Sequence, residues 1–499
     1  MNCKIVYTSQ VKCTIRGLSL DTKKYLFNKY SFFVPSARFS PLYKLGRWNG
    51  KVSYFTELGS TYISLLSEIV PYLENEGYEI EYEYMTDKYD FNFTDIDETY
   101  LNEYVWNKGH RFEGQPVQLF DHQVNIVNSF LHNPKSIIEA ATGAGKTLIC
   151  FALAKQILKY GKMIIVEPSA DLTVQTANLF NNLGIPAGIV GLGKREFNNP
   201  VIIATWQTIN SISKKSKKDK IKKISKDALT EDEIDQLVDG VVAVMCDETH
   251  QVKATEIQKI FTNIFKDIPL RWGLTGTIPK SKEDYFPLIT ALGPVVYQVD
   301  SKELQEKEIL SHCNINIINM EDKSKFDSYD EEIKYLASNK NKILFEAQLI
   351  NGIVNTGNTL VLIQRLETGE KLIEELKKLG REAVFLSGKD KSDIRFKNYK
   401  EMNEGNNKLI IATSQIASTG LDIPRIFNLV YIDMGKSFVK TIQSIGRGLR
   451  VFTDKNNVNI YDICSDTKFS KRHTKQRIEY YIEKQYPWKM LKIENWKTE

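Results

Sequence analysis

One stretch constrains this chain more than any other, the glycine-containing segment 140–147 with sequence AATGAGKT. The apolar run before it predicts a short buried strand, and apolar residues at helical spacing from Leu148 to Lys159 predict a helix after it. In a strand–loop–helix of this kind, backbone N–H groups surround phosphate oxygens and the helix N-terminus adds positive charge. Lys146 can then reach the β- and γ-phosphates of a nucleotide, and Thr147 can hold Mg²⁺.

The segment departs from the usual G-x-x-x-x-G-K-[ST] pattern at one position, because Ala140 stands where the first glycine is expected. The residues that we expect to contact the nucleotide phosphates are Thr142, Gly143, Ala144, Gly145, Lys146 and Thr147.

Two acidic residues end a second apolar run, Val241 to Cys246. Asp247 can bind Mg²⁺, and Glu248 can orient and activate an attacking water. Acids at a strand end are often only caps. Together with Lys146 and Thr147, however, they complete the residue set of a nucleotide-hydrolysis site. We therefore expect ATP and Mg²⁺ as cofactors.

Strands and helices alternate through most of the chain. Apolar runs near residues 163, 201, 241 and 272 predict strands, and a second series repeats the rhythm from about residue 312 onward. This βα alternation predicts parallel sheets that bind ligands at the carboxyl ends of their strands. The predicted fold class is α/β, with two tandem doubly wound parallel-sheet domains preceded by a small α+β domain.

Composition and length set the expected boundaries, since 499 residues suffice for about three domains. The expected parts are a small basic N-terminal domain at 1–90, an acidic connector at 91–112, the first doubly wound domain at 113–305, the second at 306–465 and a basic tail at 466–499. The six cysteines are scattered without a C-x-x-C pair, which favours a reducing cytoplasm. No apolar run has membrane-spanning length, and the first ten residues lack the apolar core of a secretory signal.

Charge is distributed unevenly near the N-terminus. Residues 1–60 hold ten Lys/Arg against two acids, whereas residues 61–110 hold twelve acids against two lysines. A basic module of this kind suits a polyanion, but the two halves could also simply balance each other's charge. The densest basic cluster, interleaved with Phe39, Tyr43 and Trp48, consists of Arg38, Lys44, Arg47 and Lys51. It offers phosphate contacts and stacking surfaces, or else a turn at Asn49-Gly50 with Trp48 in the core.

Further candidates lie on either side of the predicted first sheet and in the second domain. Gln123 can present its amide to an adenine edge, or it is a plain surface glutamine. Arg447 and Arg450 are three residues apart, so they project from one helix face and can act as arginine fingers on the γ-phosphate. Gly420 and Asp422 can join the nucleotide to the second sheet.

At this point the ordered motifs resemble those of superfamily 2 helicases. They are Gln123, AATGAGKT, EPSADLTVQ, TWQT, DETH, TGT, IASTGLD and QSIGRGLR, spread over residues 115–465. The resemblance implies two RecA-like domains that use ATP to move along nucleic acid, with Gln443 in the catalytic set. It also implies that His250 and Thr275 couple ATP hydrolysis to the nucleic-acid path. That path would be lined by Pro168, Ser169, Thr205, Trp206, Gln207, Thr413 and Ser414.

Within that superfamily, the N-terminal pattern from Arg38 to Lys51 is similar to the phage UvsW-type recombination helicases. DEAD-box RNA helicases instead carry His at the position of Gln443 and Ser-Ala-Thr at that of Thr275 to Thr277. The chain departs from the UvsW-type pattern in an insertion, 211–230, whose residues Ser211 to Lys226 hold eight Lys and one Asp. This insertion is either a DNA-gripping arm or a solvated loop.

The resemblance implies an ATP-dependent helicase that acts on branched DNA in fork regression, D-loop dissociation and Holliday-junction branch migration. Two rival enzymes are a duplex translocase that does not separate strands and an RNA helicase, and a nucleotide-gated scaffold is the non-enzymatic rival. The expected partners are branched or forked DNA and a single-strand-binding protein or recombinase, with no membrane. The expected location is the cytoplasm of a phage-infected bacterial host.

Overall fold

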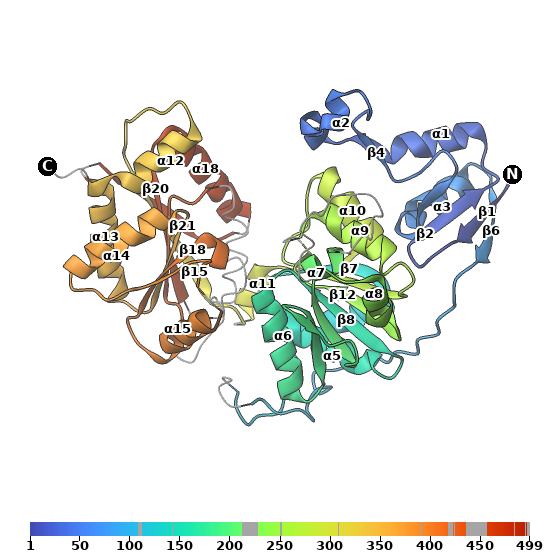
Figure 1. Cartoon of the computed structure of the whole chain (residues 1–499), viewed down its shortest axis with the longest axis horizontal. Helices are drawn as coiled ribbons and strands as arrows, with labels where there is room; N and C mark the ends of the chain where they lie inside the picture. Colours follow the sequence, from blue (N-terminus) through green and yellow to red (C-terminus); the bar gives the residue numbers. More distant parts are fainter. Residues whose placement is uncertain are drawn as a thin grey trace. The chain divides into compact units, whose positions relative to one another are not determined.

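The computed structural model (Figure 1) describes residues 1–107, 112–141, 143–211, 228–249, 252–307, 309–390, 392–417, 423, 425–435, 457–483, 485–494 and 496. The chain forms two compact units. The first consists of Met1–Glu139 and Lys146–Gln298, and the second of Ala140–Gly145 and Val299–Glu499. In this described part of the chain, no helix combines the length and apolar content that crossing a bilayer requires.

The N-terminal part of the first unit is a small α+β domain, as the sequence predicts. Its four-stranded sheet has the order β5-β2-β1-β6, in which β1 (Asn2–Tyr7) pairs antiparallel with β2 (Lys12–Arg16) and parallel with β6 (Glu79–Tyr84), and β5 is Ser60–Tyr62. Helices α1 (Leu20–Lys29) and α3 (Leu66–Asn75) contribute to the same core through Leu26, Ile69 and Leu73, all fully buried.

A second, two-stranded sheet pairs β3 (Ser31–Phe33) with β4 (Lys51–Ser53). Between the two strands, residues 34–50 form an excursion that contains a 3₁₀ turn, Pro35–Phe39, and the short helix α2 (Pro41–Lys44). Figure 1 shows this excursion leading away from the four-stranded sheet. The basic cluster predicted from the sequence therefore lies on the excursion and at its return into β4.

The N-terminal domain shares a continuous apolar core with the rest of the first unit. The Phe286 ring lies with its centroid 5.3 Å from that of Phe32 and 5.2 Å from that of Tyr54. Polar contacts join the same two parts, since Lys135 Nζ donates to Gln10 Oε1 at 3.0 Å. The basic domain is therefore packed onto its neighbour.

The acidic segment after β6, which we expected to be a connector, is tied to the helices beside it. Asn128 bonds both backbone polar groups of Ile96, at 2.9 Å to its N and 3.0 Å to its O. Lys155 Nζ lies 4.2 Å from the centroid of the Tyr100 ring and 3.0 Å from the Glu103 carboxylate. These contacts hold the segment along α4 (Asp121–His132) and α5 (Lys146–Ile157).

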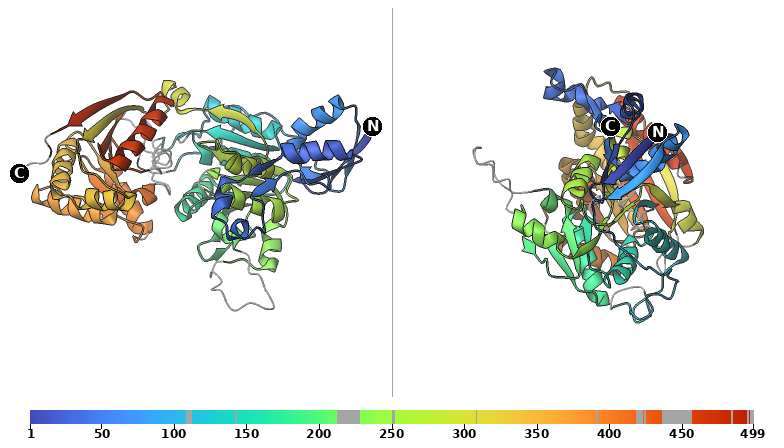
Figure 2. Two further views of the ribbon diagram at one scale, coloured as in Figure 1. Left: turned by 90° about the horizontal axis from the view of Figure 1, so that it is seen from above. Right: turned by 90° about the vertical axis from the view of Figure 1, so that its right-hand side faces the viewer.

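The large sheet of the first unit has eight strands in the order β10-β9-β11-β8-β12-β13-β7-β14. The strands are β7 (Lys135–Ala140), β8 (Lys162–Glu167), β9 (Ala187–Gly191), β10 (Lys194–Arg195), β11 (Val201–Thr205), β12 (Val241–Cys246), β13 (Leu270–Thr275) and β14 (Val295–Val299). The pairs β11–β8, β8–β12, β12–β13 and β13–β7 are all parallel. Figure 2 shows helices flanking the sheet, which include α6 (Ala170–Leu183), α7 (Trp206–Asn210), α8 (Glu231–Val238), α9 (Ala254–Asn263) and α10 (Lys282–Leu292).

The second unit contains a seven-stranded sheet in the order β17-β18-β16-β19-β20-β15-β21. Its strands are β15 (His312–Met320), β16 (Thr359–Ile363), β17 (Val384–Leu386), β18 (Leu409–Thr413), β19 (Asn428–Ile432), β20 (Asn457–Ser465) and β21 (Trp488–Ile493). Its helices are α11 (Ser301–Glu306), α12 (Tyr329–Ser338), α13 (Lys340–Val354), α14 (Leu366–Lys378), α15 (Ser392–Glu404), α16 (Ser414–Ala417) and α18 (Lys468–Glu483). Two α/β sheets of this kind match the predicted fold class.

The expected basic tail after residue 465 is instead part of this second sheet. β21 pairs in parallel with β15, with Ile315 opposite Trp488. On α18, Arg477 is 2% exposed and its Nε lies 2.8 Å from the buried Asp462 carboxylate. The charge pattern predicted a basic tail because sequence alone does not show that this arginine is paired inside the fold.

Candidate nucleotide-hydrolysis site and nucleic-acid path

The predicted phosphate-binding loop follows β7, and α5 begins at Lys146. Gly143 and Gly145 have φ angles of +93° and +80°, in the left-handed region that glycine adopts without strain. Ala140, at the position of the pattern's first glycine, is the last residue of β7 and is fully buried. A strand residue needs no left-handed backbone, so the alanine is compatible with the loop. Thr142 lies outside the described residues.

Lys146 meets the acidic pair at the carboxyl edge of the sheet. Lys146 Nζ lies 3.1 Å from Glu248 Oε1, and the two side chains are 6% and 3% exposed. Asp247 is also buried, and its Oδ1 accepts a hydrogen bond from the Glu248 N–H at 2.8 Å. The Asp247 N–H donates to Val166 O at 3.0 Å, which ties the acidic pair to β8.

The acidic pair is held in a strained turn. Glu248 has a φ of +48°, which is unusual for a residue with a side chain. Such strain persists only where the surrounding structure enforces it, and it concentrates at functional sites. Here the turn directs the Glu248 carboxylate to Lys146.

The site fits a nucleotide with a bound divalent cation. Thr147, half-buried at the start of α5, supplies a hydroxyl, and Asp247 supplies a carboxylate. These are the hard oxygen ligands that Mg²⁺ prefers. Within the described ranges, no group of three or more His, Cys, Asp or Glu could hold a metal by itself. Mg²⁺ in nucleotide sites is usually bound by one or two protein ligands together with phosphates.

A third carboxylate lies at the same edge of the sheet, and the sequence analysis did not select it. Glu167 ends β8, is 1% exposed, and its Oε1 accepts from Thr176 Oγ1 at 2.7 Å. Burial, followed by the charges of Asp247 and Glu167, raises the pKa of the Cys246 thiol well above its ordinary value. The sequence did contain a signal for Glu167. Like Asp247, it is an acidic residue at the end of an apolar run.

Gln123 is buried at the first turn of α4, and its Oε1 accepts from the Phe120 N–H at 3.0 Å. The side chain therefore caps this helix, and it is not the plain surface residue of the alternative reading. Thr275 ends β13, where its Oγ1 donates to Thr277 O at 2.9 Å. His250 lies outside the described residues, as do Gly420, Asp422, Gln443, Arg447, Arg450 and most of the Lys-rich insertion.

The residues expected along the nucleic-acid path in the first unit gather at the ends of the neighbouring strands β8 and β11. Gln207 Nε2 donates to Pro168 O at 3.1 Å, which joins the two strand ends directly. Ser169 caps α6 by accepting from the Leu172 N–H at 3.3 Å. Thr205 is 6% exposed and bonds Thr208 at 2.8 Å, whereas Trp206 is half-buried against the core.

Two expected path residues lie in the second unit. Thr413 ends β18 and is buried, and Ser414 begins α16 and is half-buried. In the N-terminal domain, the four members of the basic cluster, Arg38, Lys44, Arg47 and Lys51, are all exposed.

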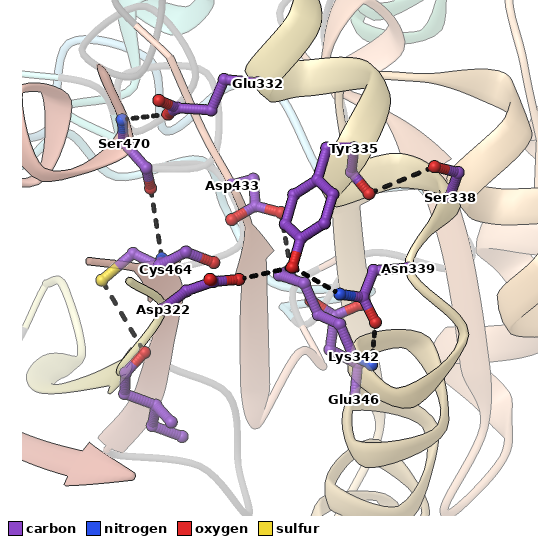
Figure 3. A network of polar contacts seen from close by, with 12 residues as sticks. Asp322, Glu332, Tyr335, Ser338, Asn339, Lys342, Glu346, Asp433, Cys464 and Ser470 are labelled. Carbon is purple, nitrogen blue, oxygen red and sulfur yellow. Dashed lines mark hydrogen bonds and ion pairs between the residues drawn. The ribbon is translucent and has the colours of Figure 1, made fainter. Parts of the chain in front are cut away.

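Beyond the predicted residues, the second unit contains a buried polar network, drawn in Figure 3. Lys342 Nζ lies 2.6 Å from Asp433 Oδ2 and also contacts Glu346, and Lys342 and Glu346 are fully buried. Burial alone lowers the pKa of the Lys342 ammonium, but the two carboxylates outweigh it and raise this pKa. Asp433 follows β19 with a φ of +45°, so the lysine fixes a strained turn at the end of this strand.

Comparisons with known proteins show which families and structures this chain is similar to. Residues 116–280 match the family model "Type III restriction enzyme, res subunit", and residues 339–452 match "Helicase conserved C-terminal domain". The chain is 23% identical to the ATP-dependent DNA helicase uvsW of Enterobacteria phage T4 over 90% of this chain and 88% of that protein. It is 26% identical to the DNA 3'-5' translocase XPB2 of Sulfurisphaera tokodaii, over 45% and 46% of the two chains.

Among solved structures, a fragment of an HsdR subunit of a type I restriction enzyme from Vibrio vulnificus is similar in fold. The TM-score is 0.55 at 16% identity, covering 97% of this chain and 85% of that one.

Proposed function

We propose that the chain is a superfamily 2 helicase of the UvsW-like type, an enzyme that hydrolyses ATP, and that it acts on branched DNA. In general terms, its activity is that of a DNA helicase or translocase. The proposal adds fork regression, D-loop dissociation and Holliday-junction branch migration. The similarity to uvsW over most of both chains supports it.

The observation that carries the ATPase chemistry is the buried contact between Lys146 and Glu248, 3.1 Å long. We assign Lys146 to the γ-phosphate and Glu248 to the attacking water, whose proton its carboxylate can accept. Asp247 and Thr147 would hold Mg²⁺, which neutralises phosphate charge when bound. Arg447 and Arg450, with Gln443, remain candidates from the sequence for stabilising the transition state.

The second part of the proposal concerns the basic N-terminal domain. Residues 1–60 carry ten Lys/Arg and two acids, a formal excess of +8, and the basic cluster is exposed. We propose that this domain, residues 1–90, holds a duplex arm through phosphate contacts while the first and second α/β domains grip a strand. Pro168, Ser169, Thr205, Trp206, Gln207, Thr413 and Ser414 would line the strand, and His250 and Thr275 would couple it to ATP.

A duplex translocase that does not separate strands is the second candidate. The match of residues 116–280 to the res-subunit model favours it. The two activities differ in their product, because only a helicase releases a displaced strand.

The test compares ATP hydrolysis and strand separation on single strands, blunt duplex, forks, four-way junctions and RNA duplex. If the activity is specific for branches, the protein should separate the strands of forks and junctions. The Glu248→Gln protein is the matched control and should show no activity. A triplex-displacement assay on blunt duplex detects translocation. Displacement of the third strand without any separation of forks would favour the translocase, and stimulation by RNA alone would reject both DNA activities.

A further inference from the structure

Three large apolar side chains lie exposed on the excursion between β3 and β4. Phe39 is 81% exposed, Leu42 is 53% exposed and Leu45 is 67% exposed. All three lie within seven consecutive positions, and Phe39 and Leu45 are among the most exposed large apolar side chains of the N-terminal domain. Exposing such groups costs solvation free energy, so apolar surface gathered in one place marks a binding surface.

The excursion holds these side chains on an ordered backbone. The N–H groups of Leu45 and Arg47 donate to Pro41 O and Leu42 O, each at 2.9 Å. At its base, Trp48 Nε1 donates to Lys51 O at 2.9 Å. Gly50 has a φ of +75°, and a side chain there would collide with the Phe33 ring. The three apolar side chains therefore project from a turn that is held by hydrogen bonds within the excursion itself.

Within the excursion itself the charge is of one sign, although Glu283 on α10 accepts a hydrogen bond from Ser36 at the start of the excursion. No acidic residue occurs between positions 34 and 51, and the four cations of the basic cluster are exposed. A partner that fits this surface must combine negative charge with flat apolar faces. Nucleic acid has both, but duplex DNA hides its base faces in the stack, and only unpaired or terminal bases offer them.

We propose that Phe39 stacks on a base at the branch point of the DNA, with Leu42 and Leu45 in contact with the neighbouring unpaired nucleotide. The cations beside them hold the phosphates of the adjoining duplex arm. This inference rests on the proposed branched-DNA function and adds to it the element that distinguishes a branch from continuous duplex.

The test uses forks carrying 2-aminopurine at the branch nucleotide, whose fluorescence reports base stacking. The full-length protein is compared with Phe39→Ala, with Phe39→Trp, which keeps a stacking ring, and with Leu58→Ala. Leu58 is the matched control because it is 84% exposed in the same domain but lies outside the excursion.

Phe39→Ala should lose the fluorescence change and bind the fork about tenfold more weakly, within the range seen for loss of one stacked base. Its salt dependence of binding should be unchanged, because no phosphate contact is removed. Phe39→Trp and Leu58→Ala should behave as the unmodified protein does. All variants should keep ATP hydrolysis on single strands.

Equal fork binding and fluorescence in Phe39→Ala and Leu58→Ala would overturn the inference. If the unmodified protein still prefers forks to blunt duplex in that case, the proposed function stands without it. If the unmodified protein shows no such preference, the proposed function itself fails. A Phe39→Ala protein that binds forks normally but no longer binds an acidic single-strand-binding protein would show that the surface docks a protein instead.

Discussion

Replacing Lys146 with alanine should have two effects, one on ATP hydrolysis and one on the stability of the fold. Because Lys146 forms a buried ion pair with Glu248, a second substitution can separate the two effects. ATP hydrolysis should be lost, because Lys146 is the cation that we assign to the γ-phosphate. The fold should also lose stability, because Glu248 is 3% exposed and its carboxylate lies 3.1 Å from the Lys146 ammonium. Removing one member of a buried pair costs about 3–5 kcal/mol, a large share of the roughly 5–15 kcal/mol that stabilises a domain.

The double variant Lys146→Ala/Glu248→Gln should recover most of that stability, since a neutral amide is far less costly to bury than a carboxylate that has lost its ammonium partner. It should recover no hydrolysis. Lys4→Ala is the control, because Lys4 pairs with Glu81 at a similar distance, 3.3 Å, with both side chains exposed. A pair of that kind contributes little to stability.

Urea denaturation followed by circular dichroism gives the stabilities, and phosphate release gives the turnover. The reasoning is refuted if Lys146→Ala unfolds at the same urea concentration as the unmodified protein. It is equally refuted if the double variant is no more stable than the single one.

Four further outcomes are expected. Glu248→Gln should bind ATP but not turn it over, since an amide cannot accept the water's proton; equilibrium binding and phosphate release decide this. Arg447→Ala and Arg450→Ala should lower kcat by orders of magnitude with a smaller effect on KM, and a raised KM at unchanged kcat would contradict the finger role. Changing all four cations of the basic cluster to alanine should lower the salt slope of junction binding by up to about 3.6, at about 0.9 per contact. Burial, and then Arg271, lowers the pKa of Lys135 to about 8, whereas the unfolded chain keeps the ordinary value of 10.5. The unfolded state then binds more protons above pH 8, so urea midpoints should rise between pH 8 and pH 9.5, and Lys135→Met should remove this rise.

The candidate nucleotide site could be located from the sequence because its chemistry is local. A glycine loop before a helix and two acids after an apolar strand each have a fixed spacing in the chain. The parallel sheet then brings Lys146 and Glu248 together, although they are 102 positions apart. Periodicity was enough to indicate that sheet, since the fully buried strands are continuous apolar runs.

The parts that the sequence did not predict depend on contacts between distant residues. Arg477 was predicted as one cation of a basic tail, yet it pairs with Asp462 inside the second unit. Lys342 is a single lysine in a helical stretch, and nothing local indicates that two carboxylates surround it. A pattern of residue types also does not show which side chains are exposed. The sequence therefore showed Phe39 as an aromatic residue beside cations, but not that its side chain is 81% exposed.

The packing of the N-terminal domain decides how its role can be tested. Its aromatic residues contact Phe286 on α10, and Tyr62 accepts a hydrogen bond of 3.5 Å from Gln258 on α9. These two helices follow directly after the acidic pair and after Thr275 in the chain. Deleting residues 1–90 would therefore expose apolar surface on the ATP-binding part itself, and a loss of activity would not separate lost DNA contacts from a disturbed motor. The excursion itself contacts α10 through Ser36, which donates a hydrogen bond to Glu283. Phe39, Leu42 and Leu45 are 53–81% exposed, so substitutions at these three positions change the proposed DNA surface and leave the buried interface in place.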